Sequence, residues 1–219
     1  MVNIPLKRTW GDIAEYKADQ VDLHLLRSVL TKHKAGIDVI AGPTTPAVAE
    51  MISPDTMLES INILRKQYDY IIIDIPHDFS PVAIHMLDIA DIILLLLAPE
   101  LASVRAAVAA INTYPQLGYQ EQKIKLIMNR TFGQPGLRQD QIERAISNNF
   151  EVVIPYEPEM FLKAINVGKP FIFDKPRSHV SVLLENLAYS LSKSEHKEMP
   201  PVSPTPSWER VNRRLSLLD

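Results

Sequence analysis

The stretch Tyr68-Asp-Tyr-Ile-Ile-Ile-Asp-Ile-Pro76 decides the fold class, because it is apolar at nearly every position from 70 to 75 and carries a carboxylate, Asp74, at its end. A strand that is covered on both faces has such a continuous apolar run, whereas a strand with one solvated face alternates. Further β-branched or aliphatic runs alternate with helical patterns at 37–41, 92–97, 124–129 and 151–154. We therefore expect an α/β fold: a doubly wound, mostly parallel sheet with helices on both faces.

Two helix starts are marked by a serine followed by proline, at Ser53-Pro54 and Ser80-Pro81. Serine is a good N-cap and proline suits the first helical position, because its missing N–H has no partner there in any case. The apolar residues after the first of these starts recur at helical spacing as Met57, Ile61, Leu64 and Tyr68. Further helices are predicted over 21–33, 100–113, 138–148, 158–167 and 179–192.

Composition limits the class of protein. The 219 residues are 46% hydrophobic and 22% charged, which predicts one globular domain over 1–192 followed by a tail. A net charge of −3 gives no sign of a nucleic-acid-binding surface. The absence of cysteine excludes a disulfide scaffold, and the amino terminus has no apolar signal region, so we expect a cytoplasmic protein. The six histidines show no metal-binding spacing.

The tail begins with a proline-rich linker over 193–206, which we expect to be extended. Residues 207–219 can form a short amphipathic helix. Its apolar arc consists of Trp208, Val211, Leu215 and Leu218. Peripheral membrane contact, docking to a partner protein and disorder all remain open for this segment.

Asp74 is the candidate for chemistry, because ligands of open α/β sheets gather beyond the carboxyl ends of the strands. A carboxylate there can orient the water shell of a phosphate-bound Mg²⁺, and the loop 76–80 can then sense the terminal phosphate. The residues by themselves leave open a plainer alternative, in which Asp74 caps the next loop or helix.

Several motifs follow one another in an order and at spacings that resemble the MinD/ParA family of P-loop ATPases. They are Asp74-Ile-Pro76, Asp91-Ile-Ile-Leu-Leu-Leu-Leu-Ala-Pro99, Leu126-Ile-Met-Asn-Arg130, Val153-Ile-Pro155 and Ala164-Ile-Asn-Val-Gly-Lys-Pro170. Within that family the chain is most similar to the pilus-assembly branch called CpaE or TadZ. That similarity rests on Leu25-Leu-Arg-Ser-Val-Leu30, Gly36-Ile-Asp-Val-Ile-Ala-Gly-Pro43, Ser53-Pro-Asp55 and Ile154-Pro-Tyr-Glu-Pro158. The resemblance covers residues 9–172.

The resemblance implies binding of ATP and Mg²⁺. Asp74 would be the Walker B acid, acting on Mg²⁺ through water, and Asn129 would hydrogen-bond the adenine edge. A carboxamide offers a donor and an acceptor side by side, which suits adenine. The other residues that the resemblance assigns are Pro76, His77 and Asp78 in switch II, and Arg130 and Pro155 in the base pocket. Without the family context, Asn129 is as well explained by a turn and Pro155 by the end of a strand.

The family's role, carried over, is the spatial positioning or assembly of an envelope machine such as a pilus or secretion system. We expect a homodimer that contacts partner proteins and that lies in the cytoplasm or peripherally at the inner face of the membrane, the tail helix making the contact.

The phosphate-binding loop of such an ATPase is absent from the 219 residues. The only Gly-Lys pair is Gly168-Lys169, which precedes a proline and follows a predicted helix. A P-loop needs glycines and a lysine between a strand and a helix. We therefore expect negligible hydrolysis by this chain alone. Two explanations stay open: Met1 lies inside a longer reading frame, which we favour, or the protein is an ATP-independent scaffold that dimerises or docks to partners.

Overall fold

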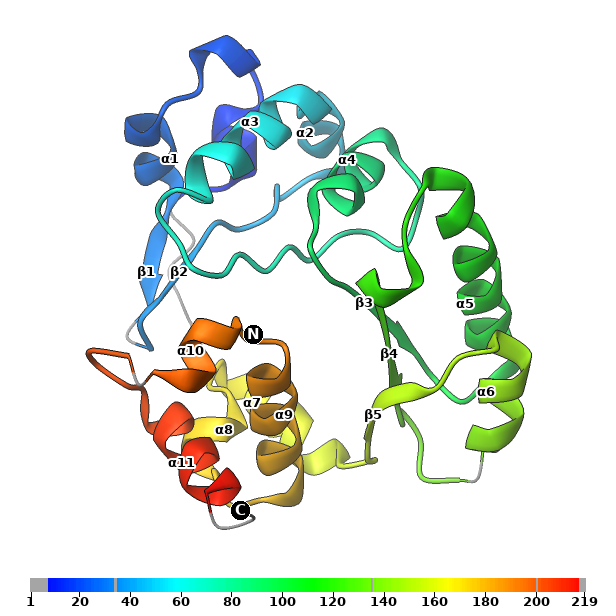
Figure 1. The fold of residues 1–219 in the computed structure, drawn as a ribbon. Helices are drawn as coiled ribbons and strands as arrows, with labels where there is room; N and C mark the ends of the chain where they lie inside the picture. Colours follow the sequence, from blue (N-terminus) through cyan, green and yellow to red (C-terminus); the bar gives the residue numbers. More distant parts are fainter. Residues whose placement is uncertain (1–7, 34, 135, 200, 217–219) are drawn as a thin grey trace. The chain divides into compact units, whose positions relative to one another are not determined.

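The computed structural model describes residues 8–33, 35–134, 136–199 and 201–216. The chain divides after Asp91 into two compact units, an amino-terminal unit up to residue 91 and a carboxy-terminal unit from residue 92 (Figure 1). The single domain over 1–192 that the sequence predicts stays a prediction.

The carboxy-terminal unit is built on a parallel sheet of β3 (Ile93–Leu97), β4 (Ile124–Asn129) and β5 (Phe150–Ile154), in the order β3-β4-β5. The middle strand is its core: Leu126, Ile127 and Met128 are 1%, 2% and 0% exposed. Each such side chain stabilises the fold by about 1.5–3 kcal/mol on burial. The predicted strand at 124–129 is therefore confirmed, and it is buried on both faces although Lys125 and Asn129 interrupt its apolar run.

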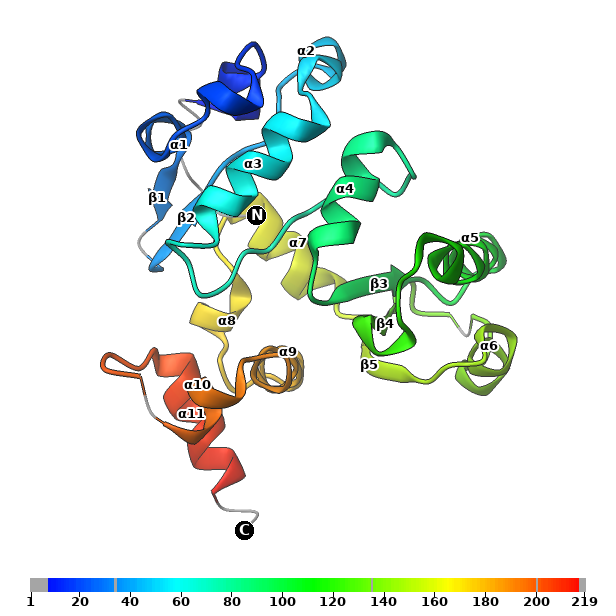
Figure 2. The same ribbon diagram turned by 45° about the horizontal axis from the view of Figure 1, so that its top comes forward.

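Helices cover both faces of this sheet (Figures 1 and 2). Sequential parallel strands with right-handed crossovers place both connecting helices on one face. These are α5 (Leu101–Thr113) and α6 (Gln139–Ile146), which contact each other. On the other face Val180 of α9 (His179–Ser190) packs with Ile127 and Ile154. The α/β class with a parallel sheet flanked by helices is confirmed. The remaining elements of this unit are 3-10 turns Tyr114–Leu117 and Glu121–Lys123, α7 (Pro158–Val167), α8 (Phe171–Asp174), α10 (Ser194–Glu198) and α11 (Pro206–Leu215).

The amino-terminal unit packs short helices around its own core, in which Ile13 and Leu26 are fully buried and Val29 is 1% exposed. Its helices are α1 (Leu23–Val29), α2 (Pro46–Met51), α3 (Pro54–Leu64) and α4 (Pro81–Ile89), with 3-10 turns Trp10–Ile13 and Ala18–Gln20. An antiparallel pair of strands, β1 (Thr31–His33) and β2 (Ile37–Val39), completes it.

The predicted serine-proline helix starts are confirmed. The hydroxyl of Ser53 accepts a hydrogen bond from the Thr56 N–H at 3.0 Å at the start of α3, and Ser80 caps α4 through the Ala83 N–H at 3.4 Å. Each cap satisfies one backbone donor that the first turn leaves without a partner. α2 and α11 begin in the same way, at a threonine followed by proline.

The stretch 70–75 is not a strand, and this prediction was wrong. Ile71, Ile73 and Ile75 pack against the core of the amino-terminal unit, whereas Tyr70 and Ile72 are 48% and 94% exposed. No described strand pairs with this segment. An apolar run reports the tendency of a segment to be buried, but a strand also needs a neighbour to accept and donate its backbone hydrogen bonds.

Two other boundaries differ from the sequence expectation. The predicted helix 21–33 ends at Val29, because 31–33 pair with 37–39 in a hairpin whose turn uses Gly36 at a φ of 80°. A positive φ is accessible to glycine without strain. The predicted extended linker 193–206 contains α10, and among the described residues between α10 and α11, 199 and 201–205 lack regular structure.

Candidate functional site

The carboxyl ends of β4 and β5 bring the predicted base-pocket residues together. Asn129 is the last residue of β4 and pairs with Ile154, the last residue of β5. The Arg130 N–H donates to the Ile154 carbonyl at 3.0 Å, so the pairing extends one residue beyond β4. Pro155 follows directly. Asn129, Arg130 and Pro155 therefore lie at one edge of the sheet, as expected for parallel strands.

Residues 131–134 and 136–138 form a loop that contacts the chain just beyond the outer strands, β3 and β5. The Leu137 N–H donates to the Pro99 carbonyl at 2.9 Å, just beyond β3. A Cβ on Gly136 would lie 2.2 Å from that same oxygen, and one on Gly133 would lie 2.9 Å from the ring of Tyr156. The loop backbone thus approaches both strand ends more closely than a side chain would allow. Sequence reasoning missed these residues; the glycines and proline after Arg130 indicate a turn but not its neighbours.

The exposed groups at this edge suit a flat, hydrogen-bonding ligand. Asn129 is half-buried, and within the described parts of the chain its carboxamide makes no hydrogen bond. The Tyr156 ring is 43% exposed and Arg130 is exposed. An aromatic ring and a guanidinium can each stack on a heterocycle, while the carboxamide can pair with its polar edge.

The predicted metal and switch residues lie in the amino-terminal unit, and all are exposed: Asp74, Pro76, His77 and Asp78. The Ser80 N–H donates to Asp78 Oδ1 at 3.0 Å, and this hydrogen bond lowers the pKa of the Asp78 carboxyl. The loop is thereby tied to the start of α4, which Ser80 caps. The predicted metal and switch residues thus lie near one another in the amino-terminal unit. The predicted base-pocket residues lie near one another in the carboxy-terminal unit.

No cluster of three or more histidine or acidic side chains positioned for a metal occurs among the described residues. Mg²⁺ bound to a nucleotide keeps several waters and takes ligands from the phosphates, so one or two carboxylates suffice. The exposed Asp74 carboxylate has the chemistry of an outer ligand that acts through water.

The tail residues lie on α11, where Val211 is 2% exposed and Trp208 and Leu215 are half-buried. α11 packs against α9, so its apolar arc faces the protein. Leu218, the fourth residue of the predicted arc, lies outside the described residues. Nowhere in the described chain is a helix long and apolar enough to span a bilayer.

Comparison with protein-family models finds no match. The septum site-determining protein MinD of Thermotoga maritima is 31% identical over 168 residues, which are 74% of this chain. The chain spans 61% of the length of that relative. Two solved structures share the fold. The ParA family ATPase from Chlorobium tepidum matches with a TM-score of 0.77 at 23% identity, covering 86% of this chain and 77% of its own. MinD of Pyrococcus horikoshii in complex with Mg-ADP matches with a TM-score of 0.70 at 19% identity, covering 91% and 78%.

Proposed function

We propose, on the premise that the chain is homologous in sequence and fold to the ATPases of the MinD/ParA family, that it binds the adenine of ATP at the sheet edge formed by Asn129, Arg130 and Pro155. The observation that carries this proposal is the half-buried Asn129 carboxamide, which has no hydrogen-bond partner in the described chain and stands beside Pro155. A half-buried polar group of this kind is well placed to pair with a ligand.

Asp74 is proposed, from the family resemblance, to be the acid that orients water around the Mg²⁺ of a bound nucleotide. Its position directly before the loop of Pro76, His77 and Asp78 supports this role, because that loop is fastened to the start of α4 by the Asp78–Ser80 hydrogen bond. A nucleotide phosphate that alters the water shell at Asp74 would act on a segment that continues directly into α4. This is the arrangement expected of a nucleotide-sensing switch.

Hydrolysis depends on a group that the 219 residues do not supply. None of their seven glycines belongs to a loop that could surround phosphates and end in Lys-Ser or Lys-Thr. Phosphoryl transfer rests on positioning and charge stabilisation around the transferred group. We propose that this chain alone recognises the base weakly and turns over ATP at a negligible rate.

The proposed biological role is the ATP-linked positioning or assembly of an envelope machine. The relative named for septum-site determination supports positioning. The resemblance to the CpaE/TadZ branch, carried by Ser53-Pro-Asp55 and Ile154-Pro-Tyr-Glu-Pro158, favours a pilus or secretion system as the target. A homodimer that contacts partner proteins, with peripheral contact at the inner face of the membrane, belongs to the same proposal.

A second candidate function is an ATP-independent scaffold, and one observation favours it. β3 is an edge strand of its sheet, yet Leu94 and Leu96 are 42% and 56% exposed along it. An apolar edge strand with free backbone groups is a site for pairing with another chain. In this reading the sheet serves protein contacts and the nucleotide site is vestigial.

Calorimetric titration with ATP·Mg²⁺ and with adenosine separates the two. Both ligands should bind weakly, and ATP·Mg²⁺ should bind more tightly than adenosine by the amount that Asp74 contributes through the water shell of Mg²⁺. Asn129→Ala should weaken both by about tenfold, the equivalent of one or two lost hydrogen bonds. Asn112→Ala, an exposed asparagine on α5, is the matched control and should change neither.

The metal role of Asp74 is tested in the same titration. Asp74→Ala should weaken ATP·Mg²⁺ and leave adenosine unchanged, with the exposed Asp69→Ala as control. Unchanged affinities in both the Asn129 and the Asp74 variants would discard the site. A dimer that binds neither ligand would support the scaffold.

A further inference from the structure

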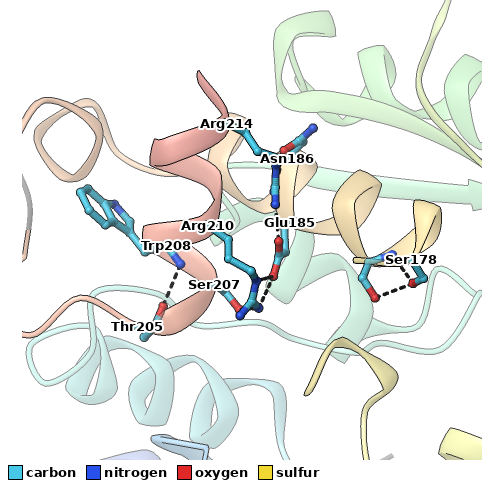
Figure 3. Close-up of polar contacts among 9 residues, drawn as sticks. Ser178, Glu185, Asn186, Thr205, Ser207, Trp208, Arg210 and Arg214 are labelled. Atoms are coloured by element: carbon cyan, nitrogen blue, oxygen red, sulfur yellow. Dashed lines mark hydrogen bonds and ion pairs between the residues drawn. The ribbon is translucent and has the colours of Figure 1, made fainter. Parts of the chain in front are cut away.

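A buried carboxylate holds the carboxy-terminal helix in place (Figure 3). The Glu185 side chain, on α9, is 3% exposed. Arg210 Nε donates to its Oε1 at 3.0 Å, and Arg214 Nη2 donates to its Oε2 at 3.0 Å. The two arginines are four residues apart on α11, so they share one face of that helix. Each carboxylate oxygen thus receives its own arginine, which fixes the position of α11 along α9.

Neighbouring contacts reinforce this clamp, by which we mean the contacts of Arg210 and Arg214 with Glu185. Arg214 Nη2 also donates to Asn186 Oδ1 at 3.0 Å, and Arg210 Nη2 donates to Ser207 Oγ at 2.9 Å. Val211, between the arginines, is 2% exposed. The Trp208 indole N–H donates to the His196 carbonyl of α10 at 3.1 Å. The face of α11 that carries the apolar arc is therefore occupied by the protein itself.

We propose that α11 is a detachable latch, which docks on α9 through Glu185 and opens without unfolding of the sheet beneath it. The arrangement is specific in register but weakly held. A buried ion pair gains little net stability, because the desolvation of its charges offsets most of their attraction. Arg214 Nε is moreover buried without a hydrogen-bond partner in the described structure, a cost that release into water would remove.

The connection to α11 permits such opening. Residues 199 and 201–205 have no helix or strand, and Met199 and Val202 are 67% and 105% exposed. Exposed side chains and the lack of regular structure are typical of regions that open locally. The consequence is that docking on α9 and any other use of the same helix face are mutually exclusive, because Val211 becomes accessible only after release.

Hydrogen exchange followed by mass spectrometry on the full chain tests the latch. Arg210→Gln should speed exchange of the α11 amides by roughly tenfold, while β4 and α5 keep wild-type rates. Arg213→Gln is the matched control, since Arg213 is exposed on the same helix and loses the same charge. Glu185→Gln preserves the shape of the side chain, removes the charge from both arginine contacts, and should open α11 at least as far.

Two results would overturn the proposal. If Arg210→Gln exchanged like Arg213→Gln, the carboxylate would not be holding the helix. If exchange rose in β4 and α5 together with α11, the helix would be an integral part of the folded unit. Should Glu185→Gln fail to fold, the partly exposed Arg210 variant still decides between these outcomes.

Discussion

Replacing Gly136 by alanine should loosen the loop that covers the proposed base site. The added Cβ would stand 2.2 Å from the Pro99 carbonyl oxygen and 3.0 Å from the ring of Phe132, whereas ordinary contact begins at 3.4 Å. The oxygen belongs to backbone at the end of β3 and cannot rotate away as a side chain would. The loop must therefore move, and a displacement of that size breaks the 2.9 Å hydrogen bond from the Leu137 N–H to Pro99.

The expected magnitude follows from three contributions. A lost hydrogen bond costs about 0.5–1.5 kcal/mol, and steric overpacking typically adds about 1–3 kcal/mol. Opposing these, alanine stiffens the unfolded chain and contributes about 0.4–1 kcal/mol in favour of folding. We expect a net loss of about 2 kcal/mol from the free energy of opening this loop. Gly42→Ala is the matched control, because its Cβ meets nothing within 4 Å, and it should be neutral or slightly stabilising.

Native-state hydrogen exchange of the Leu137 amide measures this effect. An opening free energy lower by about 2 kcal/mol corresponds to exchange faster by about thirtyfold. The affinity for adenosine should fall as well, because the loop lies against Tyr156 and Pro99 at the same edge. A Leu137 amide that exchanges at the wild-type rate in Gly136→Ala would refute the close approach of Gly136 to the Pro99 carbonyl oxygen.

Three further changes test the fold. Burial and the hydrogen bond to Asp38 raise the pKa of Tyr68 from 10.0 to about 12, so between these pH values the folded state keeps a proton that the unfolded state loses. The free energy of unfolding should therefore fall as pH rises from 10 towards 12. This decline should be missing in Tyr68→Phe. Ser80→Ala removes the cap of α4 and should lower the free energy of urea-induced unfolding by about 1 kcal/mol. Met128→Ala empties a fully buried position and should cost about 2–5 kcal/mol in the same assay, whereas Met199→Ala, at a residue 67% exposed, should cost almost nothing.

Local chemistry made much of the fold predictable. The serine-proline pairs gave the starts of α3 and α4 because an N-cap acts within a single turn. The run 124–129 coincides with β4 because its side chains are buried on both faces of the sheet. Asn129 could be placed at a strand end by the same reasoning, whereas its role toward a ligand came from the family resemblance and stays a prediction.

What escaped prediction depends on neighbours that are distant in sequence. The segment 70–75 has the composition of a strand, but pairing is a property of two segments, and the sequence shows only one. The contact of Gly136 with Pro99 and the clamp of Glu185 by the two arginines join residues more than 20 positions apart. Arg210 and Arg214 could be assigned to one helix face, but nothing in their spacing indicates which carboxylate they meet.

Photo-crosslinking with 8-azido-ATP tests the central claim most directly, because trypsin cuts this region into informative peptides. Cleavage after Arg130 and Arg138 isolates the loop over the sheet edge, and cleavage after Arg144 and Lys163 isolates the peptide that carries Tyr156. If the base lies at the ends of β4 and β5, these two peptides carry the label and excess adenosine displaces it. Label that falls outside these two peptides and the peptide 126–130, which carries Asn129 itself, or that adenosine does not displace, would contradict an adenine site beside Asn129.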